Sequence, residues 1–149
     1  MRLAGPDDEQ LLFDWANDPG VRDMARNDSP ICWNEHRDWF AAKLADDSCK
    51  IWIAETEGKP IGQIRLDREG DRAEVDISVD PSVRGHGIGT KMLTMPVIAA
   101  WPGVRRIQAA VRRGNDASAT AFCKAGFEVR ASDDDYIYFE KVTGNAVTD

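Results

Sequence analysis

The sequence predicts a single α/β domain, also classed as α+β, in which helices cover one mixed and mostly antiparallel twisted sheet. Three consecutive segments between Ile51 and Val79 alternate apolar and polar residues and are joined by hairpin-length turns. A segment of helical spacing then precedes another strand, which implies a parallel crossover. The length of 149 residues and the 42% of hydrophobic residues are typical of one domain with one core.

The first elements are predicted from the spacing of apolar residues. Residues 2–4 are expected to form a short strand. A helix follows over about 11–16 and ends at the turn 17–20, and a second helix runs from Asn34, as N-cap, to about Asp46. One face of each helix is apolar or aromatic, with Leu11, Leu12, Trp15 and Ala16 in the first and His36, Trp39, Phe40 and Leu44 in the second.

The middle of the chain predicts three adjacent strands near 51–53, 61–66 and 75–79. Turns at 57–60 and 68–71, each with a glycine, separate them, so the strands should form an antiparallel meander. In the third strand the apolar residues alternate with Glu74, Asp76 and Ser78. These three polar side chains should therefore lie on the opposite face of the sheet from Val75 and Ile77.

The last elements are a helix over 87–100, a strand over 107–111, a helix over 115–125 and strands over 127–130 and 136–140. Pro96 should kink or break the first of these helices, because proline removes a backbone hydrogen bond. Gly126 is expected to cap the last helix. The total is about seven strands and four helices, in a domain over 1–142 followed by a frayed tail at 143–149.

Composition excludes several classes of protein. The net charge of −7 argues against binding an extended nucleic-acid backbone. No apolar run is long enough to cross a membrane, and residues 1–10 lack a signal-peptide pattern, so we expect a cytoplasmic protein. Cys32, Cys49 and Cys123 match neither a disulfide framework nor a metal motif, and we expect reduced packing residues and no bound metal.

Positive charge is nevertheless concentrated in one segment. Residues 81–115 contain six lysines or arginines and no acidic residue, although the whole chain is acidic. Such a basic segment in an acidic protein indicates a compact polyanionic ligand, unless it is a chance variation of surface charge.

A glycine loop lies inside this segment. Gly85, Gly87 and Gly89 follow an apolar strand and open a helix, an arrangement in which backbone N–H groups and the helix dipole favour phosphate. A Rossmann fingerprint would need glycine at Thr90 and an acidic residue about 20 positions later. The P-loop pattern lacks its Gly-Lys-Ser/Thr. The motif that remains is Arg-x-x-Gly-x-Gly, starting at Arg84.

This motif resembles that of the GNAT superfamily of N-acetyltransferases, whose pattern is Gln/Arg-x-x-Gly-x-Gly/Ala. A second block, Asn115 with Lys124, Gly126 and Phe127, is similar to the family's Asn-…-Lys-x-Gly-Phe. The resemblance implies that acetyl-CoA is the cosubstrate, with pantetheine between two splayed parallel strands. The residues implied in binding it are Ser78, Val79, Arg84, Gly85, His86, Gly87, Ile88, Gly89, Thr90, Asn115 and Phe122.

The resemblance leaves the catalytic groups open. Glu74 and Asp76 are the candidate catalytic residues, since family members often place a general base near Glu74, but both could be solvated strand residues. His86 is read as a loop residue rather than a proton carrier. The family often has tyrosine where this chain has Phe122, which cannot protonate the leaving thiolate. Phe122 could instead pack on pantetheine or belong to the core.

The first third of the chain is expected to form the acceptor site. Residues 15–22 and 30–40 look like the opening of the amino-sugar N-acetyltransferases of the pseudaminic-acid pathway. Arg22, Trp33 and His36 are the candidate substrate-binding residues, although a tryptophan stripe at helical spacing more often belongs to the core.

The resemblance therefore predicts acetyl transfer to a primary amine, preferably of a nucleotide-linked amino sugar or another small amino compound, by a monomer or homodimer. A protein or peptide amine is the alternative acceptor. A catalytically silent acyl-CoA-binding module is the alternative of another class, and a plain dinucleotide-binding domain is a weaker one.

Overall fold

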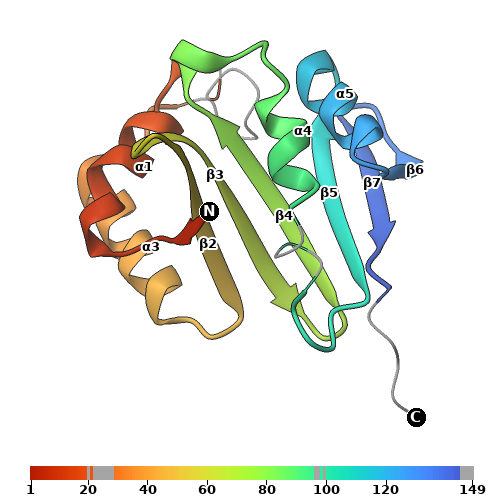
Figure 1. Ribbon diagram of the computed structural model, residues 1–149, viewed down its shortest axis with the longest axis horizontal. Coiled ribbons are helices and arrows are strands. Elements are labelled where there is room, and N and C mark those ends of the chain that lie inside the picture. Colours follow the sequence, from red (N-terminus) through yellow and green to blue (C-terminus); the bar gives the residue numbers. More distant parts are fainter. Residues whose placement is uncertain (20, 22–28, 96–97, 99, 145–149) are drawn as a thin grey trace.

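The computed structural model describes residues 1–19, 21, 29–95, 98 and 100–144 (Figure 1). Within these residues, seven strands form one sheet in the order β1-β2-β3-β4-β5-β7-β6. The β4–β5 pair is parallel, and the other neighbouring pairs in this part of the chain are antiparallel. The predicted fold class is confirmed.

The strands follow the predicted order. They are β1 (Arg2–Leu3), β2 (Cys49–Thr56), β3 (Lys59–Glu69), β4 (Arg72–Val79), β5 (Arg106–Arg112), β6 (Glu128–Ser132) and β7 (Tyr136–Val142). A two-residue turn joins β2 to β3, with positive φ at both Glu57 and Gly58. This is the turn type that matches the twist of a hairpin, so the strands pair directly on either side of it.

The helices that the structure describes over their full length are four α-helices and two short 3-10 helices. They are η1 (Pro6–Asp8), α1 (Glu9–Ala16), α3 (Trp33–Ala45), η2 (Pro81–Val83), α4 (Ile88–Leu93) and α5 (Asp116–Lys124). The predicted cap of α3 was wrong, because Cys32 and not Asn34 is its N-cap. A tertiary contact decides this boundary, since the Asn17 side chain binds both backbone groups of Ile31 just before the helix.

Helix α4 is shorter than predicted, because it ends at Leu93 instead of residue 100. The Thr94 hydroxyl donates to the Lys91 carbonyl at 2.9 Å, and the Thr94 N–H also bonds back into this last turn. Pro96, which was expected to break the helix, lies outside the described residues, as do residues 145–149 of the expected tail.

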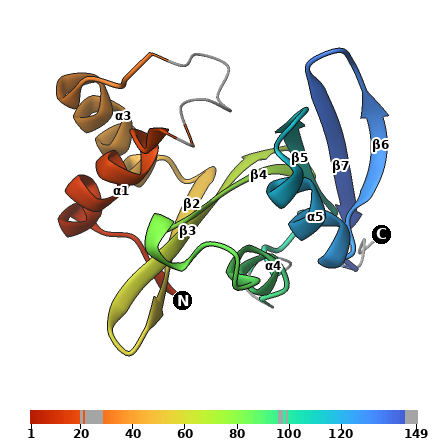
Figure 2. The ribbon, with the colours of Figure 1, turned by 90° about the horizontal axis from the view of Figure 1, so that it is seen from above.

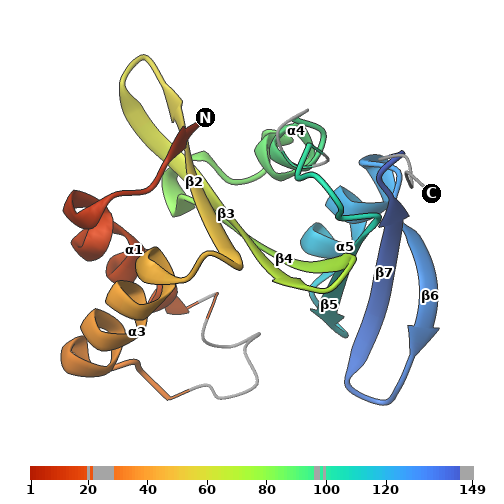
Figure 3. The same cartoon turned by 90° about the horizontal axis from the view of Figure 1, so that it is seen from below.

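The two faces of the sheet carry separate layers of helices. Figure 2 shows α1 and α3 on one face and α4 and α5 on the other, and Figure 3 shows α1 and α3 at one end of the sheet and β6–β7 at the other. Ile51 and Ile53 pack against the first pair of helices, whereas Trp52 joins the larger core on the opposite face. This follows from the alternation of side chains along β2.

The apolar face predicted for the second helix is only partly buried. His36 and Phe40 are buried, but Trp39 and Leu44 are 37% and 39% exposed. The Trp39 ring instead lies beside the Arg65 guanidinium, 5.1 Å from ring centroid to Cζ, so this part of α3 faces polar residues of the sheet.

Strands β4 and β5 separate part-way along their length. Their pairing runs from Arg72 and Arg106 to Glu74 and Gln108, although β4 continues to Val79 and β5 to Arg112. The splayed parallel pair that the resemblance implied is therefore present, and it leaves the second half of β4 unpaired on this side.

Candidate functional site

A cleft of about 1150 Å³ passes through the opening between β4 and β5. Its walls come from α1, α3, β3, β4, the glycine loop, α4, β5 and α5. The predicted site residues that line it are His36, Asp76, Ser78, Val79, Arg84, Gly85, Gly87, Ile88, Gly89, Thr90, Asn115 and Phe122. Trp33, Glu74 and His86 are not among its lining residues, and Arg22 lies outside the described part of the chain.

The glycine loop is shaped by two left-handed residues. Gly85 and Gly87 have φ of 85° and 74°, and Gly87 is the N-cap of α4. A Cβ at either position would touch nothing within 4 Å, so the backbone conformation, not space, requires glycine here. The loop thus turns its backbone toward the cleft without side chains at these two positions.

Asp80 ties this loop to the N-terminal helices. One carboxylate oxygen accepts from the Ser82 N–H and hydroxyl, and the other accepts from Trp15 Nε1 at 2.9 Å. These hydrogen bonds, from Ser82 foremost and then from Trp15, hold the pKa of Asp80 below its usual range. Helix α1 and the loop after β4 are therefore joined at the wall of the cleft.

Arg84 folds back along the end of β4. Its Nε donates to the Val79 carbonyl at 3.2 Å, and its Nη2 lies 2.9 Å from Asp18 Oδ2. In this position the guanidinium contacts the segment after α1 and a backbone acceptor of the unpaired β4 edge.

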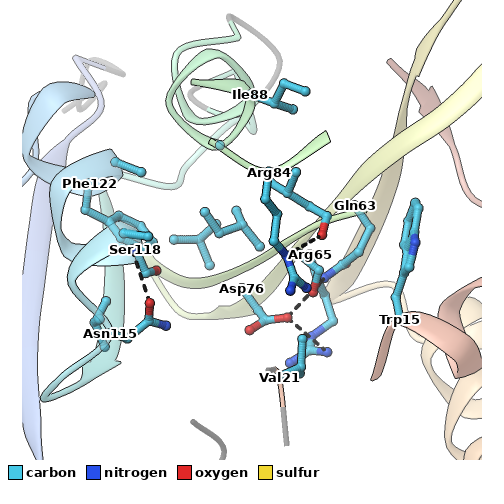
Figure 4. Close-up of a pocket in the computed structure, with 18 of the residues that line it drawn as sticks. Trp15, Val21, Gln63, Arg65, Asp76, Arg84, Ile88, Asn115, Ser118 and Phe122 are labelled. Carbon is cyan, nitrogen blue, oxygen red and sulfur yellow. Dashed lines mark hydrogen bonds and ion pairs between the residues drawn. The ribbon is translucent and has the colours of Figure 1, made fainter. Parts of the chain in front are cut away.

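A row of polar side chains lies on the α1–α3 face of the sheet. The buried Gln63 donates from Nε2 to Asp76 Oδ2 at 3.1 Å and to Ser78 Oγ at 3.2 Å. Arg65 approaches the same Asp76 oxygen at 3.9 Å (Figure 4). Gln63 and Arg65 were not predicted as site residues. Their alternation with Ile64 and Leu66 was the available signal, but only the strand register places them opposite Ser78 and Asp76.

Arg65 is held by carboxylates. Its Nε donates to Asp67 at 2.9 Å, and Lys43 donates to the other oxygen of Asp67 at 2.8 Å. Burial would raise the pKa of Asp67, but these two cations outweigh burial and hold it below its usual range. Burial would likewise lower the pKa of Arg65, and Asp76 and Asp67 hold it above its usual value.

The two predicted catalytic carboxylates occupy different surroundings. Glu74 belongs to the last register pair between β4 and β5, where the strands are still closed, and it does not line the cleft. Asp76 lies two residues further on, where the strands have opened, and its side chain lies in the middle of the cleft in Figure 4. His86 is exposed at the loop surface.

Helix α5 forms the opposite wall. Asn115 is its N-cap and accepts from the Ser118 N–H at 3.3 Å. Phe122 packs edge-on against Phe127 at 5.0 Å and stacks on Phe139 at 5.6 Å, and it is 2% exposed. Phe122 therefore belongs to the core and also lines the cleft. Ser118, one turn earlier on the helix, lines it too.

The predicted acceptor residues are largely structural in their contacts. The buried His36 ring stacks on Phe40, and its Nε2 lies 2.9 Å from the Glu9 carbonyl, to which it donates. The Trp33 ring packs edge-on against Phe13 at 5.1 Å. Trp15 and Trp39, which the sequence left as core or ligand-binding residues, both line the cleft.

Cys49, at the start of β2, is a partly buried free thiol. Burial, with Asp67 nearby, raises the pKa of the Cys49 thiol to about 12, so this thiol stays protonated. Within the described residues, no group of three His, Cys, Asp or Glu side chains is arranged to hold a metal ion. No helix in the same part of the chain is long and apolar enough to cross a membrane.

The family assignment comes from a match to the protein-family model described as acetyltransferase (GNAT) domain, and the match covers residues 1–128. The chain belongs to the GNAT acetyltransferase family. This confirms the predicted resemblance and the predicted class of enzyme. No curated protein sequence matches the chain.

Solved structures share the fold at low sequence identity. Aminoglycoside acetyltransferase AAC(6')-Ib, in complex with coenzyme A and kanamycin, is 22% identical with a TM-score of 0.80, over 95% of this chain and 92% of that one. Spermidine N-acetyltransferase from Vibrio cholerae, with CoA and spermine, is 13% identical with a TM-score of 0.81, over 97% and 95%. The Campylobacter jejuni N-acetyltransferase PseH, with acetyl coenzyme A, is 17% identical with a TM-score of 0.71, over 93% and 92%.

The residues that carry the GNAT pattern meet at this cleft. Arg84, Gly87 and Gly89 form one wall, and Asn115 and Lys124 lie on the wall across from it. The remaining two residues of the second block have structural places. Gly126 has a φ of 93° just after α5, and Phe127 is buried in the larger core.

Proposed function

We propose that this GNAT protein transfers the acetyl group of acetyl-CoA to a primary amine of a small amino compound. The observation that carries the proposal is a single cleft that joins the glycine loop to the polar row of β3 and β4 through the opening between β4 and β5. A cosubstrate held at the loop and an amine held at Asp76 would therefore meet inside one cavity. The solved structures of AAC(6')-Ib with coenzyme A and kanamycin, and of spermidine N-acetyltransferase with CoA and spermine, support a fold that holds a coenzyme and an amine together.

The loop end of the cleft suits the coenzyme. The backbone of residues 85–90 and the guanidinium of Arg84 offer donors to a pyrophosphate, in the segment that lacks acidic residues. The unpaired edge of β4 at Ser78 and Val79 offers backbone groups to the amides of pantetheine, in the manner of an added strand. Asn115 and Phe122 then line the path of the pantetheine arm.

Asp76 is the general base in this proposal. An amine attacks a thioester only as the neutral form, so a nearby group must take its proton. Gln63 and Arg65 both approach Oδ2 of Asp76, which fixes the carboxylate and leaves Oδ1 toward the substrate. Glu74 lies where the strands are closed, and His86 does not line the cleft.

Ser118 is the group proposed to meet the leaving thiolate. It lies four residues before Phe122, so the two residues share one face of α5, and both line the cleft. Its hydroxyl can donate a hydrogen bond to a sulfur anion where phenylalanine cannot. A Ser118→Ala variant should lower kcat without weakening the binding of coenzyme A.

A matched pair of variants tests the proposal. Purified protein is incubated with acetyl-CoA and a panel of amines that includes alkyl diamines, aminoglycosides and nucleotide-linked amino sugars, and products are identified by mass spectrometry. Asp76→Asn should lower kcat by about 10²- to 10⁴-fold, the usual contribution of a positioned base, whereas Glu74→Gln should stay within about twofold of the parent.

Three results would contradict the proposal. Calorimetric binding of acetyl-CoA without turnover of any amine would indicate a silent acyl-CoA-binding module. Acetylation confined to protein or peptide amines would exclude a small acceptor. Equal losses in the Asp76 and Glu74 variants would remove Asp76 from the role of base.

A further inference from the structure

One end of the cleft has an anionic and aromatic wall, in which the proposed reaction uses Asp76 with Gln63 and Arg65 but gives no role to Glu35 and Trp39. We call it the α1–α3 end, and it is lined by Trp15, Glu35, Trp39, Gln63, Arg65 and Asp76. Glu35 and Trp39 are four residues apart on α3, so their side chains lie on one face of that helix. Both side chains are exposed and line the cleft.

The charges at this end leave one carboxylate without a partner. Arg65 is matched by Asp67 at 2.9 Å and by Asp76 at 3.9 Å. Lys43 matches the second oxygen of Asp67 at 2.8 Å. Within the part of the chain that the structure describes, Glu35 lines the cleft and makes no hydrogen bond or ion pair, so the described residues of the α1–α3 end carry a net negative charge.

The described residues of this wall do not favour an acceptor that carries a diphosphate. Unmatched cations are common partners of a diphosphate, and Arg65, which is paired with carboxylates, is the single cation that lines the α1–α3 end within the described ranges. The other described cations of the cleft are Arg84, Arg112 and Lys124, which belong to the glycine loop, β5 and α5. Among the described residues of the α1–α3 end, a nucleotide-linked amino sugar therefore has no unmatched cation for its diphosphate, whereas Arg22, expected from the sequence to bind the substrate, lies outside the described residues.

We propose that the α1–α3 end binds a second cationic group of the acceptor, so that the substrate class is a diamine or a longer polyamine. This inference rests on the proposed acetyl transfer. The reactive amine lies at Asp76, and the second ammonium lies against the carboxylate of Glu35 and the ring of Trp39. An ammonium beside an indole ring gains cation–π attraction in addition to the ion pair.

The spacing of the two subsites follows from Arg65. Its Nη1 lies 3.9 Å from Asp76 Oδ2, and its Cζ lies 5.1 Å from the centroid of the Trp39 ring, so the guanidinium contacts both residues. An acceptor that reaches both residues must therefore extend past one guanidinium group. A flexible chain of several methylenes between two amines has this shape, whereas a simple monoamine occupies the Asp76 subsite alone.

The first experiment measures binding and does not depend on turnover. Isothermal titration with 1,4-diaminobutane and with butylamine, both in the presence of coenzyme A, compares two ligands that differ by one ammonium group. An exposed ion pair and one cation–π contact predict about three- to tenfold tighter binding of the diamine. Equal affinities for the two ligands would overturn the inference.

Two variants locate the effect. Glu35→Gln and Trp39→Leu should each weaken diamine binding about two- to fivefold and leave butylamine binding unchanged. Glu128→Gln, at an exposed position of β6 away from the cleft, makes the same change of charge and should alter neither. A loss that is the same for both ligands would mean that Glu35 and Trp39 only support the fold, which would also overturn the inference.

Turnover separates this inference from the proposed function. Acetylation of butylamine with kcat/KM equal to that of the diamine would leave acetyl transfer standing and remove the diamine class. Turnover of a nucleotide-linked amino sugar at a lower KM than any diamine would do the same. If diamines bind as predicted and no amine is acetylated, the proposed function fails while the cationic subsite stands.

Discussion

The ion pair between Asp18 and Arg84 should oppose the binding of coenzyme A. Arg84 is directed at Asp18 and at the Val79 carbonyl, which is one of the backbone groups proposed to bind pantetheine. A pyrophosphate at the glycine loop and an amide at Val79 both require the guanidinium to leave this position. Removing the Asp18 charge should therefore favour the coenzyme.

The size of the effect follows from exposure. The Asp18 and Arg84 side chains are 16% and 42% exposed, and a partly exposed pair of this kind contributes about 0.2 to 1 kcal/mol. Asp18→Asn should thus lower the Kd of coenzyme A by about 1.4- to 5-fold. Arg84→Ala should raise it about ten- to a hundredfold, since a hydrogen bond to a charged group is worth about 1.5 to 3 kcal/mol.

Isothermal titration of coenzyme A into four proteins provides the assay. The proteins are the parent, the Asp18→Asn and Arg84→Ala variants and their double mutant, with Asp14→Asn on α1 as a control for net charge. Asp18→Asn should have no effect once Arg84 is absent. Weaker binding by Asp18→Asn would refute the reasoning, because it would show that Asp18 orients Arg84 for the ligand.

Three further predictions concern stability. Arg2 holds the pKa of Asp8 below its ordinary value of 3.8, so this carboxylate stabilises the fold above about pH 4 and the contribution is lost as the pH falls through the lower folded pKa. The melting temperature of the Asp8→Asn variant should therefore fall by less than that of the parent protein between about pH 5 and 2.5. Parallel curves of melting temperature against pH would contradict this assignment. Gly62→Ala should destabilise by about 1 to 3 kcal/mol in urea unfolding, because its Cβ would lie 2.7 Å from the Ser78 carbonyl oxygen, and an unchanged midpoint would mean that the strands can shift apart. Phe122→Ala should cost about 3 to 5 kcal/mol in the same assay, and a cost below about 1 kcal/mol would mean that this ring is not part of the core.

Local sequence patterns were sufficient to predict the order of the helices and strands. Alternation of Val75, Ile77 and Val79 depends on neighbours along one strand, and a two-residue turn such as Glu57-Gly58 depends on its own backbone angles. Helix ends were less accurate, because contacts from distant residues decide them. The binding of Asn17 to the backbone of Ile31, before α3, is one such contact.

The coenzyme end of the site could also be predicted from the sequence. Arg84, the glycines that follow it and Asn115 stand at fixed spacings in two short segments, and the requirement for glycine at positive φ is a local property of the backbone. The chain itself therefore determined the GNAT family, the fold and the place of the glycine loop.

The other half of the site was decided by tertiary structure. Glu74 and Asp76 have the same alternation in the sequence, and only the point at which β4 leaves β5 puts one of them in the cleft. Gln63 and Arg65 reach Asp76 through the register of two strands, and Glu35 joins them from a helix about 30 residues earlier in the chain. Contacts between residues so far apart depend on how the sheet twists, opens and packs, which no local spacing of residues encodes.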